Sequence, residues 1–458
     1  MRGRKASRWA GPALIAGSLL IAGSATAGGA AVALPAPVPL MTLVSGTSFA
    51  RPPTTAQCEQ QQGLACYAPS QYHQAYDLGP LYQKGLDGRG ETIVIVDPFG
   101  YQFIRGELAI FDKAFKLPAP PSFRVIQPAG RVPPFNPKNG AMVGFGRETS
   151  LDVEYAHAMA PGANILLAET PAAEGLGTSG FPQIVKAENY VISHRLGTVI
   201  SQSFGTAEQT FPSVASILGL RSAYENAAAH GVSVVSGTGD QGATDFKTDT
   251  ALFLHRAAFW PATDPLVTAV GGTQMHLTAS GARLQPDTVW NDTNLLGTPS
   301  AGGGGQSVVF KRPAYQNGVA AAVGPARGIP DISMSAAVDG SALVYLDARL
   351  NGIAGFSLTG GTSEATPLLA GIVAIADQYA GHGLGLLNPA LYRMYAGHAP
   401  GLVDVTAGTN TVTFLQGGAE HSVPGFDAVS GYDLASGTGT VNAALFVPEL
   451  VAAAGGHR

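Results

Sequence analysis

The stretch ETIVIVD, residues 91–97, decides the fold of this chain. It is a short run of β-branched apolar residues that ends in an acid, which is typical of a strand buried in a parallel sheet. Further runs follow along the chain: GANILLAE at 162–169, GTVISQS at 197–203 and GVSVVSGTGD at 231–240. Helical patterns lie between them. This alternation predicts an α/β fold with a mainly parallel central sheet and helices on both faces.

The composition indicates a large body that carries few charges. The chain has 458 residues, of which 45% are hydrophobic and only 12% charged, and its formal net charge is −5. No basic run lies inside the body, so we expect no binding to nucleic acid. A sparsely charged surface suits an acidic medium, because fewer carboxylates are neutralised there. We expect residues 60–450 to form one domain, since no clear linker divides them.

The first residues have the pattern of a secretory signal. MRGRKASRW is basic, AGPALIAGSLLIAG is apolar, and SATA offers small residues at Ala25 and Ala27. This predicts a signal peptide over residues 1–27 and a secreted protein without stable membrane association. The alternative is an uncleaved membrane anchor, because apolar residues continue to about Leu40. Residues 28–59 are rich in Ala, Pro and Thr and are predicted to be a short leader.

The two cysteines, Cys58 and Cys66, stand eight residues apart in CEQQQGLAC. In a secreted chain this spacing favours a small disulfide loop over a metal site, which would need more ligands.

The stretch GGTSEATPLLAGIVA, residues 360–374, is typical of a nucleophile loop. Ser363 follows a Gly-Gly-Thr turn and precedes an apolar run that predicts a helix. A serine hydroxyl needs a base to take its proton, and that base is usually histidine. No histidine in the chain lies in the His-Gly-Thr context of a subtilisin helix, so a carboxylate is the better candidate.

Three acids are the candidates for this chemistry. Glu148 and Asp152 are spaced i, i+4 in GRETSLDVEYAHAMAP, which places them on one helix face, while Glu154 points elsewhere. Two carboxylates so close share a proton, although a solvated helix face has the same spacing. Asp240 follows a buried strand among glycines. If protonated it would donate to an oxyanion, and otherwise it would cap the next turn.

These motifs, in their order along the chain, resemble the sedolisin family, the serine-carboxyl peptidases with a subtilisin-like fold. The resemblance covers nearly the whole globular region. It rests on ETSLD, SQSFG, GTGDQG, FWPATDPLVTAVGGT, GGGGQSVVFKRPAYQ, RGIPDIS, GGTSEATPLLAG and LLNPALY.

The resemblance implies a role for each candidate. Ser363 would be the nucleophile, and Glu148 would take its proton and later protonate the leaving amine. Asp152 would hydrogen-bond Glu148, and Asp240 would donate to the oxyanion beside the backbone N–H of Ser363. Both conditions, an ionised base and a protonated Asp240, are met together only in acid.

The resemblance also implies a substrate site and a calcium site. Ser203, Phe204 and Gly205 would offer backbone groups to an extended peptide, which adds a strand to the sheet edge. One structural Ca²⁺ would be held near the C-terminus, with Asp427 excluded. Its implied ligands are the side chains or carbonyls of Asp404, Val405, Val429, Gly431 and Asp433.

The chain departs from the family pattern at several places. No folded pro-domain fits in residues 28–59, so we expect folding without one or with other help. Thr149 replaces a frequent Trp, and Glu364 puts an extra carboxylate beside the nucleophile. Asp97 stands where a subtilisin has its catalytic Asp, and without a partner histidine we predict a structural role for it.

We therefore expect a monomeric, secreted endopeptidase that cleaves proteins or peptides at acidic pH. One alternative is a tripeptidyl-peptidase of the same family, and another is a neutral-pH subtilisin-type hydrolase. A third, from another class, is a non-catalytic secreted binding protein on the same fold. Side-chain preference does not follow from the sequence.

Overall fold

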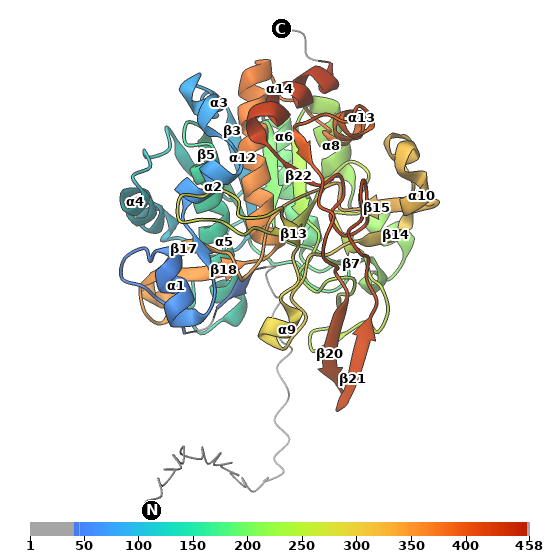
Figure 1. Cartoon of the computed structure of the whole chain (residues 1–458), viewed down its shortest axis with the longest axis horizontal. Helices are drawn as coiled ribbons and strands as arrows, with labels where there is room; N and C mark the ends of the chain where they lie inside the picture. The colour runs from blue at the N-terminus through green and yellow to red at the C-terminus, as the bar shows by residue number, and fades with distance from the viewer. Residues whose placement is uncertain (1–40, 45, 456–458) are drawn as a thin grey trace, which may run out of the picture. The chain divides into compact units, whose positions relative to one another are not determined.

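The computed structural model describes residues 41–44 and 46–455, and the predicted signal peptide, 1–27, lies outside them. In the described part, an eight-stranded sheet has the spatial order β13–β12–β8–β6–β3–β5–β4, with β16 beside β12 (Figure 1). Every pair is parallel except β12 with β13. The strands are β3 (Thr92–Pro98), β4 (Phe123–Ile126), β5 (Asn164–Thr170), β6 (Val199–Gln202), β8 (Ser233–Gly237), β12 (Thr268–Gln274), β13 (Thr288–Val289) and β16 (Ile332–Ser335).

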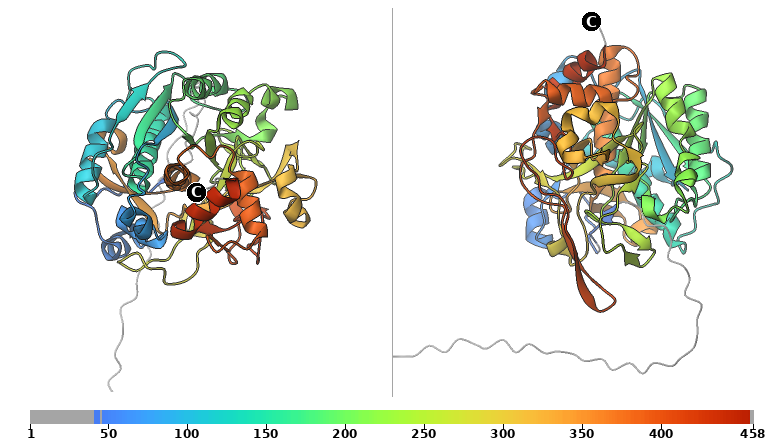
Figure 2. Two further views of the ribbon diagram at one scale, coloured as in Figure 1. Left: turned by 90° about the horizontal axis from the view of Figure 1, so that it is seen from above. Right: turned by 90° about the vertical axis from the view of Figure 1, so that its right-hand side faces the viewer.

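Helices cover both faces of this sheet, as the right-hand view of Figure 2 shows. Alternate residues of β3 enter different cores, because successive side chains of a strand point to opposite faces. Ile93 and Ile95 pack under α5 and α12, whereas Val94 and Val96 pack under α6 and α8. The predicted α/β fold with a mainly parallel sheet is therefore confirmed.

The helices among the described residues vary from one turn to about five turns. Their bounds are α1 (Thr55–Gln62), α2 (Pro69–Ala75), α3 (Gly79–Gln83), α4 (Ile104–Phe115), α5 (Gly140–Met159), α6 (Phe181–Ser193), α7 (Val214–Leu218), α8 (Ser222–His230), α9 (Thr293–Leu296), α10 (Ala320–Val323), α11 (Ala348–Asn351), α12 (Thr362–Ala380), α13 (Asn388–Ala396) and α14 (Ala443–Ala454). No helix in the described part has the length and hydropathy needed to cross a membrane.

Helices α5 and α12 pack closely against each other. A Cβ at Gly371 of α12 would lie 2.5 Å from Cβ of Met159 and 3.3 Å from the carbonyl oxygen of Ala156. Glycine is therefore needed for this approach. Ser363 lies eight residues before Gly371, and Glu148 lies eight residues before Ala156. An α-helix rises about 1.5 Å per residue, so equal spacings from this contact bring Ser363 and Glu148 to the same height along the two packed helices.

The described part of the predicted leader belongs to the folded body. Strand β1 (Thr42–Leu43) pairs with β18 (Gly355–Gly360), and Phe49 forms a bridge with Phe356. The sheet that contains them has the order β1–β18–β17–β2, with β17 (Ser341–Leu346) and β2 (Cys66–Tyr67). The described residues of the predicted leader, 41–44 and 46–59, include strand β1, which extends the second sheet at its edge, and most of helix α1.

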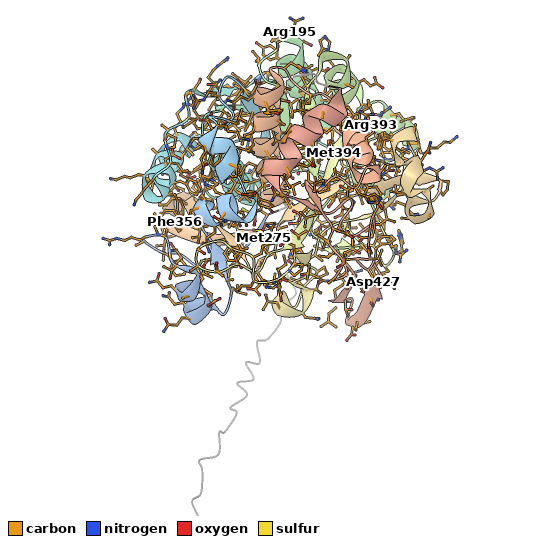
Figure 3. All side chains as sticks on the ribbon, turned by 45° about the horizontal axis from the view of Figure 1, so that its top comes forward. Arg195, Met275, Phe356, Arg393, Met394 and Asp427 are labelled. Carbon is orange, nitrogen blue, oxygen red and sulfur yellow. A yellow bond between two sulfur atoms is a disulfide. The ribbon has the colours of Figure 1, made fainter. Side chains whose placement is uncertain are left out.

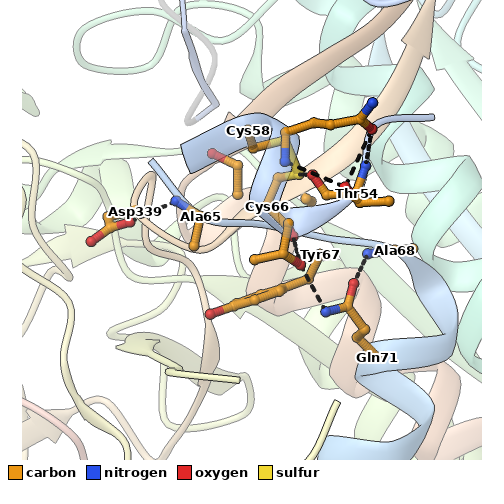
Figure 4. Close-up of a disulfide and its surroundings, with 12 residues drawn as sticks. Thr54, Cys58, Ala65, Cys66, Tyr67, Ala68, Gln71 and Asp339 are labelled. Atoms are coloured by element: carbon orange, nitrogen blue, oxygen red, sulfur yellow. Dashed lines mark hydrogen bonds between the residues drawn. A yellow bond between two sulfur atoms is a disulfide. The ribbon is translucent and has the colours of Figure 1, made fainter. Parts of the chain in front are cut away.

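Helix α1 is tied to β2 by a disulfide between Cys58 and Cys66 (Figure 4). Thr54 caps α1 by accepting from the backbone N–H of Gln57. Ala65, beside Cys66, donates its N–H to the Asp339 carboxylate at 2.9 Å. Ala65 thus fixes one end of the disulfide-closed loop to the body.

Two-stranded ribbons lie around the main sheet, and one of them, β20 with β21, extends away from it (Figure 1). The ribbons pair β7 (Thr206–Ala207) with β11 (Phe259–Trp260), β9 (Phe246–Thr248) with β10 (Ala251–Leu252), β14 (Gly305–Lys311) with β15 (Ala326–Ile329), β19 (Leu402–Val403) with β22 (Thr440–Val441), and β20 (Val412–Gln416) with β21 (Ala419–Val423).

Candidate active site

Ser363 is the second residue of α12, directly after the turn that follows β18. Gly361 makes this turn with φ of 123°, a conformation that favours glycine. A Cβ at Gly360 would lie 2.7 Å from the carbonyl oxygen of Ala336, so the second glycine is also required. The Ser363 hydroxyl is buried and has no hydrogen bond of normal geometry within the described residues. The turn therefore presents a free hydroxyl at a helix N-terminus.

Glu148 and Asp152 lie on one face of α5, one turn apart, and both are fully buried. Burial raises the pKa of Glu148 well above its ordinary value, and the adjacent Ser363 side chain partly offsets this. Burial also raises the pKa of Asp152, and the charges of Asp97 and Glu148 raise it further. Two such neighbours resist simultaneous ionisation, so they titrate as a coupled pair.

Asp97, at the end of β3, joins this pair. Burial raises the pKa of both Asp97 and Asp152; the adjacent Asp152 side chain partly offsets this at Asp97, whereas the charge of Asp97 raises the pKa of Asp152 further. Burial still raises the pKa of Asp97 to about 7. The sequence could not show that β3 ends against α5, so the proximity of Asp97 to the carboxyl pair was not predicted. Asp97, Asp152 and Glu148 form a row of carboxyls that ends at Ser363.

Asp240 lies on the other side of the nucleophile, in the loop after β8 (Ser233–Gly237). Its Oδ1 accepts hydrogen bonds from the backbone N–H and the hydroxyl of Thr362, both at 2.8 Å. Its buried Oδ2 has no partner among the described residues. Burial raises the pKa of Asp240 to about 8. The protonated acid can therefore donate from Oδ2 beside Ser363, as a carboxylic acid in an oxyanion site must.

The segment after β6, predicted to bind substrate, also supports the carboxyl pair. The Ser203 hydroxyl donates to Oδ1 of Asp152 at 2.9 Å. Phe204 is fully buried against the second core. A Cβ at Gly205 would lie 2.3 Å from the Phe259 ring, so glycine allows close packing there. The side-chain role of Ser203 was not predicted, and an acid facing a Ser-x-Ser strand end is the signal that could have suggested it.

The residues set aside as decoys lie away from Ser363. Glu154 accepts the backbone N–H of Tyr345 at 3.0 Å, on the opposite side of α5. His157, on the same helix, has Nε2 at 2.8 Å from the Pro118 carbonyl oxygen. Neither residue contacts the nucleophile.

The structure also shows where Glu364 and Thr149 lie, the two residues that depart from the family pattern beside the site. Glu364 turns into the first core, where its Oε1 accepts the Tyr72 hydroxyl at 2.8 Å. Thr149 donates its hydroxyl to the Phe145 carbonyl at 2.8 Å, and its side chain lowers the pKa of Asp97. Thr149 therefore touches the carboxyl row, whereas Glu364 does not face it.

The five predicted calcium ligands gather around one loop. The N–H of Gly431 donates to Asp404 at 2.8 Å, and the N–H of Val429 donates to Asp433 at 3.0 Å. Gly431 has φ of 86°, which turns the loop back between the two acids. Asp427, the excluded acid, is exposed and forms a bridge with Thr409 (Figure 3).

This loop has the donor chemistry that calcium prefers, namely carboxylates together with backbone carbonyls. Within the described residues no group of three or more Asp, Glu, His or Cys side chains gathers to hold a metal. A cation between Asp404 and Asp433 would therefore complete its coordination with carbonyl oxygens. The residues fit such an ion on the chemistry of the donor set.

Comparisons with known proteins agree with this geometry. The chain is 31% identical over 379 residues to kumamolisin of Bacillus sp., a match over 81% of this chain and 62% of kumamolisin. It is 31% identical over 272 residues to sedolisin of Pseudomonas sp., over 58% of this chain and 43% of sedolisin. Tripeptidyl-peptidase 1 of Rattus norvegicus also matches. No family model matches the chain.

A solved structure of Pseudomonas sedolisin, described as a serine-carboxyl proteinase complexed with two molecules of pseudo-iodotyrostatin, has the same fold. It superimposes with a TM-score of 0.68 at 26% identity, over 85% of this chain and 99% of that one. An α/β fold that brings a serine and a carboxyl pair together defines the class of serine-carboxyl peptidases. These matches support the sedolisin family for this chain. It spans less than two thirds of the length of kumamolisin and sedolisin.

Proposed function

We propose that this chain is a secreted endopeptidase of the serine-carboxyl type that hydrolyses peptide bonds at acidic pH. The observation that carries the proposal is the position of buried Glu148 beside the hydroxyl of Ser363. Membership in a family whose named members are peptidases supports it. The signal pattern over residues 1–27 supports secretion.

The acylation step uses groups on both sides of Ser363. Glu148 accepts the hydroxyl proton while Oγ attacks the carbonyl carbon of the peptide bond. The negative charge on the carbonyl oxygen receives a hydrogen bond from Oδ2 of protonated Asp240 and another from the N–H of Ser363. The carbon–nitrogen bond then breaks, and Glu148 returns its proton to the leaving amine. Water repeats these steps in reverse order to release the acyl group.

Asp152 and Asp97 help Glu148 to act as a base. Like charges that share a buried site do not ionise together, so the row holds at most one charge in acid. One charge is what the mechanism needs. In its protonated form Asp152 would donate its one proton to ionised Glu148. Ser203 keeps Asp152 in place through its 2.9 Å hydrogen bond.

The upper limit of activity is set by Asp240. Its donor role requires the protonated form, and its pKa of about 8 lies far above the ordinary value of 3.8. Activity should therefore fall as the pH rises through about 8, because the ionised acid repels the oxyanion. This places the working range below that pH.

Tripeptidyl-peptidase activity is the second candidate, because relatives with that name match the chain. The two activities differ in whether the substrate needs a free amino terminus. Cleavage of an internal bond in an amino-terminally blocked peptide would support the endopeptidase, whereas release of tripeptides from free peptides alone would support the second candidate.

We also propose that the loop around residues 428–433 holds one structural Ca²⁺ between Asp404 and Asp433. The ion would supply positive charge that holds the two segments together. Removal by a chelator should lower Tm by several degrees, and the Asp404→Asn variant should not respond to the chelator. An equal response in both proteins would contradict the site.

The test of the main proposal is hydrolysis of a denatured protein by purified material from pH 2 to 8. We expect a maximum in acid that Ser363→Ala abolishes. A maximum near neutrality that survives Glu148→Ala would mean another base. No cleavage at any pH by folded protein would favour a non-catalytic binding protein.

A further inference from the structure

A pocket at the carboxyl edge of the main sheet has no part in the mechanism above. It lies where three neighbouring strands end: Phe99 follows β3, Gln127 follows β4, and Glu169 lies near the end of β5. We call it the edge pocket. Its volume is about 210 Å³, and a cavity of about 150 Å³ is enough to hold a benzene ring. Parallel sheets bind ligands outside the carboxyl ends of their strands, so the edge pocket has the position of a binding site.

The register of the sheet places the edge pocket beside the carboxyl row. Asp97 of β3 is the registered partner of Glu169 on β5. Registered residues of adjacent parallel strands point to the same face, and the strands lie about 4.8 Å apart. On that face Ile95 of β3 and Leu167 of β5 belong to the core that includes α5. The edge pocket is therefore one strand away from Asp97.

Helix α5 connects the edge pocket to the nucleophile. Met142, near the start of this helix, lines the pocket. It lies six residues before Glu148, which is about 9 Å along the helix axis, and Glu148 lies next to Ser363. An extended peptide advances about 3.3 Å per residue. A side chain in the edge pocket would therefore come from a residue about two to four positions away from the cleaved bond.

The walls of the edge pocket are apolar and partly aromatic. Phe99 has φ of 60°, which is rare for a bulky residue, and its N–H donates to the Thr170 carbonyl at 2.8 Å. Its ring meets the Phe145 ring edge to face, with centroids 6.1 Å apart. Such backbone outliers are concentrated at ligand-binding positions. The walls suit a flat aromatic side chain, and they consist of Phe99, Val132, Pro133, Pro134, Phe135 and Met142.

The floor of the edge pocket is polar at one point. Glu169 is 4% exposed, and its Oε2 accepts a hydrogen bond from Nε2 of Gln127 at 2.8 Å. Its Oε1 has no hydrogen-bond partner among the described residues and packs on Gly100, where any Cβ would collide with it. Gly100 also lines the pocket. A carboxylate accepts from a hydroxyl, and a protonated carboxyl also donates to one, so Oε1 suits a neutral hydroxyl at any pH.

We propose that the edge pocket is a specificity pocket that binds a tyrosine side chain of the peptide substrate, two to four residues from the cleaved bond. The ring would pack between Phe99 and Met142, and the phenol hydroxyl would hydrogen-bond Oε1 of Glu169. This inference rests on the proposed function, because it concerns the peptide held at Ser363.

Quenched fluorescent peptides with one cleaved bond, identified by mass spectrometry, test the pocket. Alanine, phenylalanine and tyrosine are placed in turn at each of the four positions on either side of that bond. For the wild type we expect one position, between the second and the fourth, where tyrosine raises kcat/KM over alanine by at least about tenfold, because an aromatic ring is buried. Tyrosine should exceed phenylalanine there by about fivefold, the size of one hydrogen bond.

Val132→Phe and Val232→Phe are the matched variants. Both valines are buried and line a pocket, but Val232 lies at the opposite edge of the sheet, just before β8. Val132→Phe fills the edge pocket and should lower the ratio of kcat/KM for tyrosine to that for alanine by at least about fivefold. Val232→Phe should keep this ratio. A ratio of this kind cancels any general loss of activity.

Glu169→Met tests the polar floor. It removes the acceptor, so the ratio of tyrosine to phenylalanine should fall to about one while phenylalanine stays preferred over alanine. A wild type without a tyrosine preference at any of these positions, or a preference that survives in Val132→Phe, would overturn the inference. If Val132→Phe does not fold, the ratio of tyrosine to phenylalanine in Glu169→Met decides.

Failure of the proposed function would look different. A wild type that cleaves no peptide would refute the peptidase, and binding would then test the pocket. Fluorescence anisotropy of the labelled alanine, phenylalanine and tyrosine peptides gives their Kd values without cleavage. Equal Kd values for the three would overturn the edge pocket, whereas tighter binding of the tyrosine peptide that is lost in Val132→Phe would support it.

Discussion

Helix α5 carries buried acids on two faces, and the two faces differ in what they contact. Glu148 and Asp152 point toward the carboxyl end of the sheet, where Ser363, Asp97 and one another are their neighbours. Glu154 points toward β17, where the backbone N–H of Tyr345 satisfies it. All three acids are fully buried, and burial raises the pKa of each well above its ordinary value.

The difference teaches that burial and a raised pKa do not make a base. Glu154 has both properties and lies two residues from Asp152, but it has no nucleophile to act on. Glu148 has no hydrogen-bond partner of normal geometry on either oxygen within the described residues, and the serine lies next to it. An open acceptor beside a free hydroxyl is therefore the property that separates the two faces.

The largest expected effect comes from removing the base. Glu148→Gln keeps the size of the side chain but cannot accept the Ser363 proton. We expect kcat/KM to fall by at least about 10³-fold, within the range known for general bases. Glu154→Gln, which keeps an acceptor for Tyr345, should stay within about threefold of the wild type. Equal losses in both variants would erase the distinction between the faces.

A smaller effect is expected at Asp240. Asp240→Ala removes a donor to the oxyanion and should lower kcat by about 10²- to 10³-fold. Asp240→Asn keeps a donor that does not titrate, so its loss should be smaller and its activity should no longer fall near pH 8. The pH dependence of kcat/KM for the three proteins measures this. An unchanged alkaline decline in Asp240→Asn would assign that decline to another group.

Ser203 should have an effect of about tenfold. Ser203→Ala removes the 2.9 Å hydrogen bond to Asp152 but leaves the backbone of the substrate strand intact. The loss of one hydrogen bond to a positioning group corresponds to about tenfold in rate. We expect the loss in kcat rather than in KM, because the hydroxyl contacts the acid and not the peptide. A change confined to KM would mean that the serine binds substrate directly.

The smallest effect on catalysis, and a clear effect on stability, is expected at Glu188. Burial raises its pKa from 4.5 to about 8. The folded protein therefore binds this proton more tightly than the unfolded chain does. The resulting stability is complete below about pH 4.5 and is lost as the pH rises to about 8. Glu188→Gln should make Tm less dependent on pH in this window by the equivalent of about 1–3 kcal/mol, with little change in activity. Calorimetry at several pH values would show it, and an unchanged slope would mean that Glu188 is already paired.

The sequence was sufficient to predict the positions of those site residues that follow from the regular geometry of helices and strands. The i, i+4 spacing placed Glu148 and Asp152 on one face, and the alternation of strands and helices placed Asp97, Ser203 and Asp240 at one sheet edge. The same helical period explains why Glu154 faces another side of the helix. These inferences need only the geometry of isolated elements.

The rest of the site depends on how elements meet. That β3 ends beside Asp152 follows from how the helix packs on the sheet, so the proximity of Asp97 to Asp152 was not predicted. Glu364 follows the nucleophile, but one residue on a helix turns a side chain by about 100°, which directs it to Tyr72 instead. The pairing of β1 with β18 was missed because a two-residue strand carries too little pattern to predict.

The most direct test of the account is to trap the acyl group on Ser363. A peptide ester would be mixed with the enzyme at acidic pH, quenched within milliseconds and examined by mass spectrometry. The account predicts rapid acylation of Ser363 in the wild type and in Glu154→Gln, and acylation slowed by at least about 10³-fold in Glu148→Gln. Acylation of Ser363 at the wild-type rate in Glu148→Gln would contradict the claim that this carboxylate activates the serine.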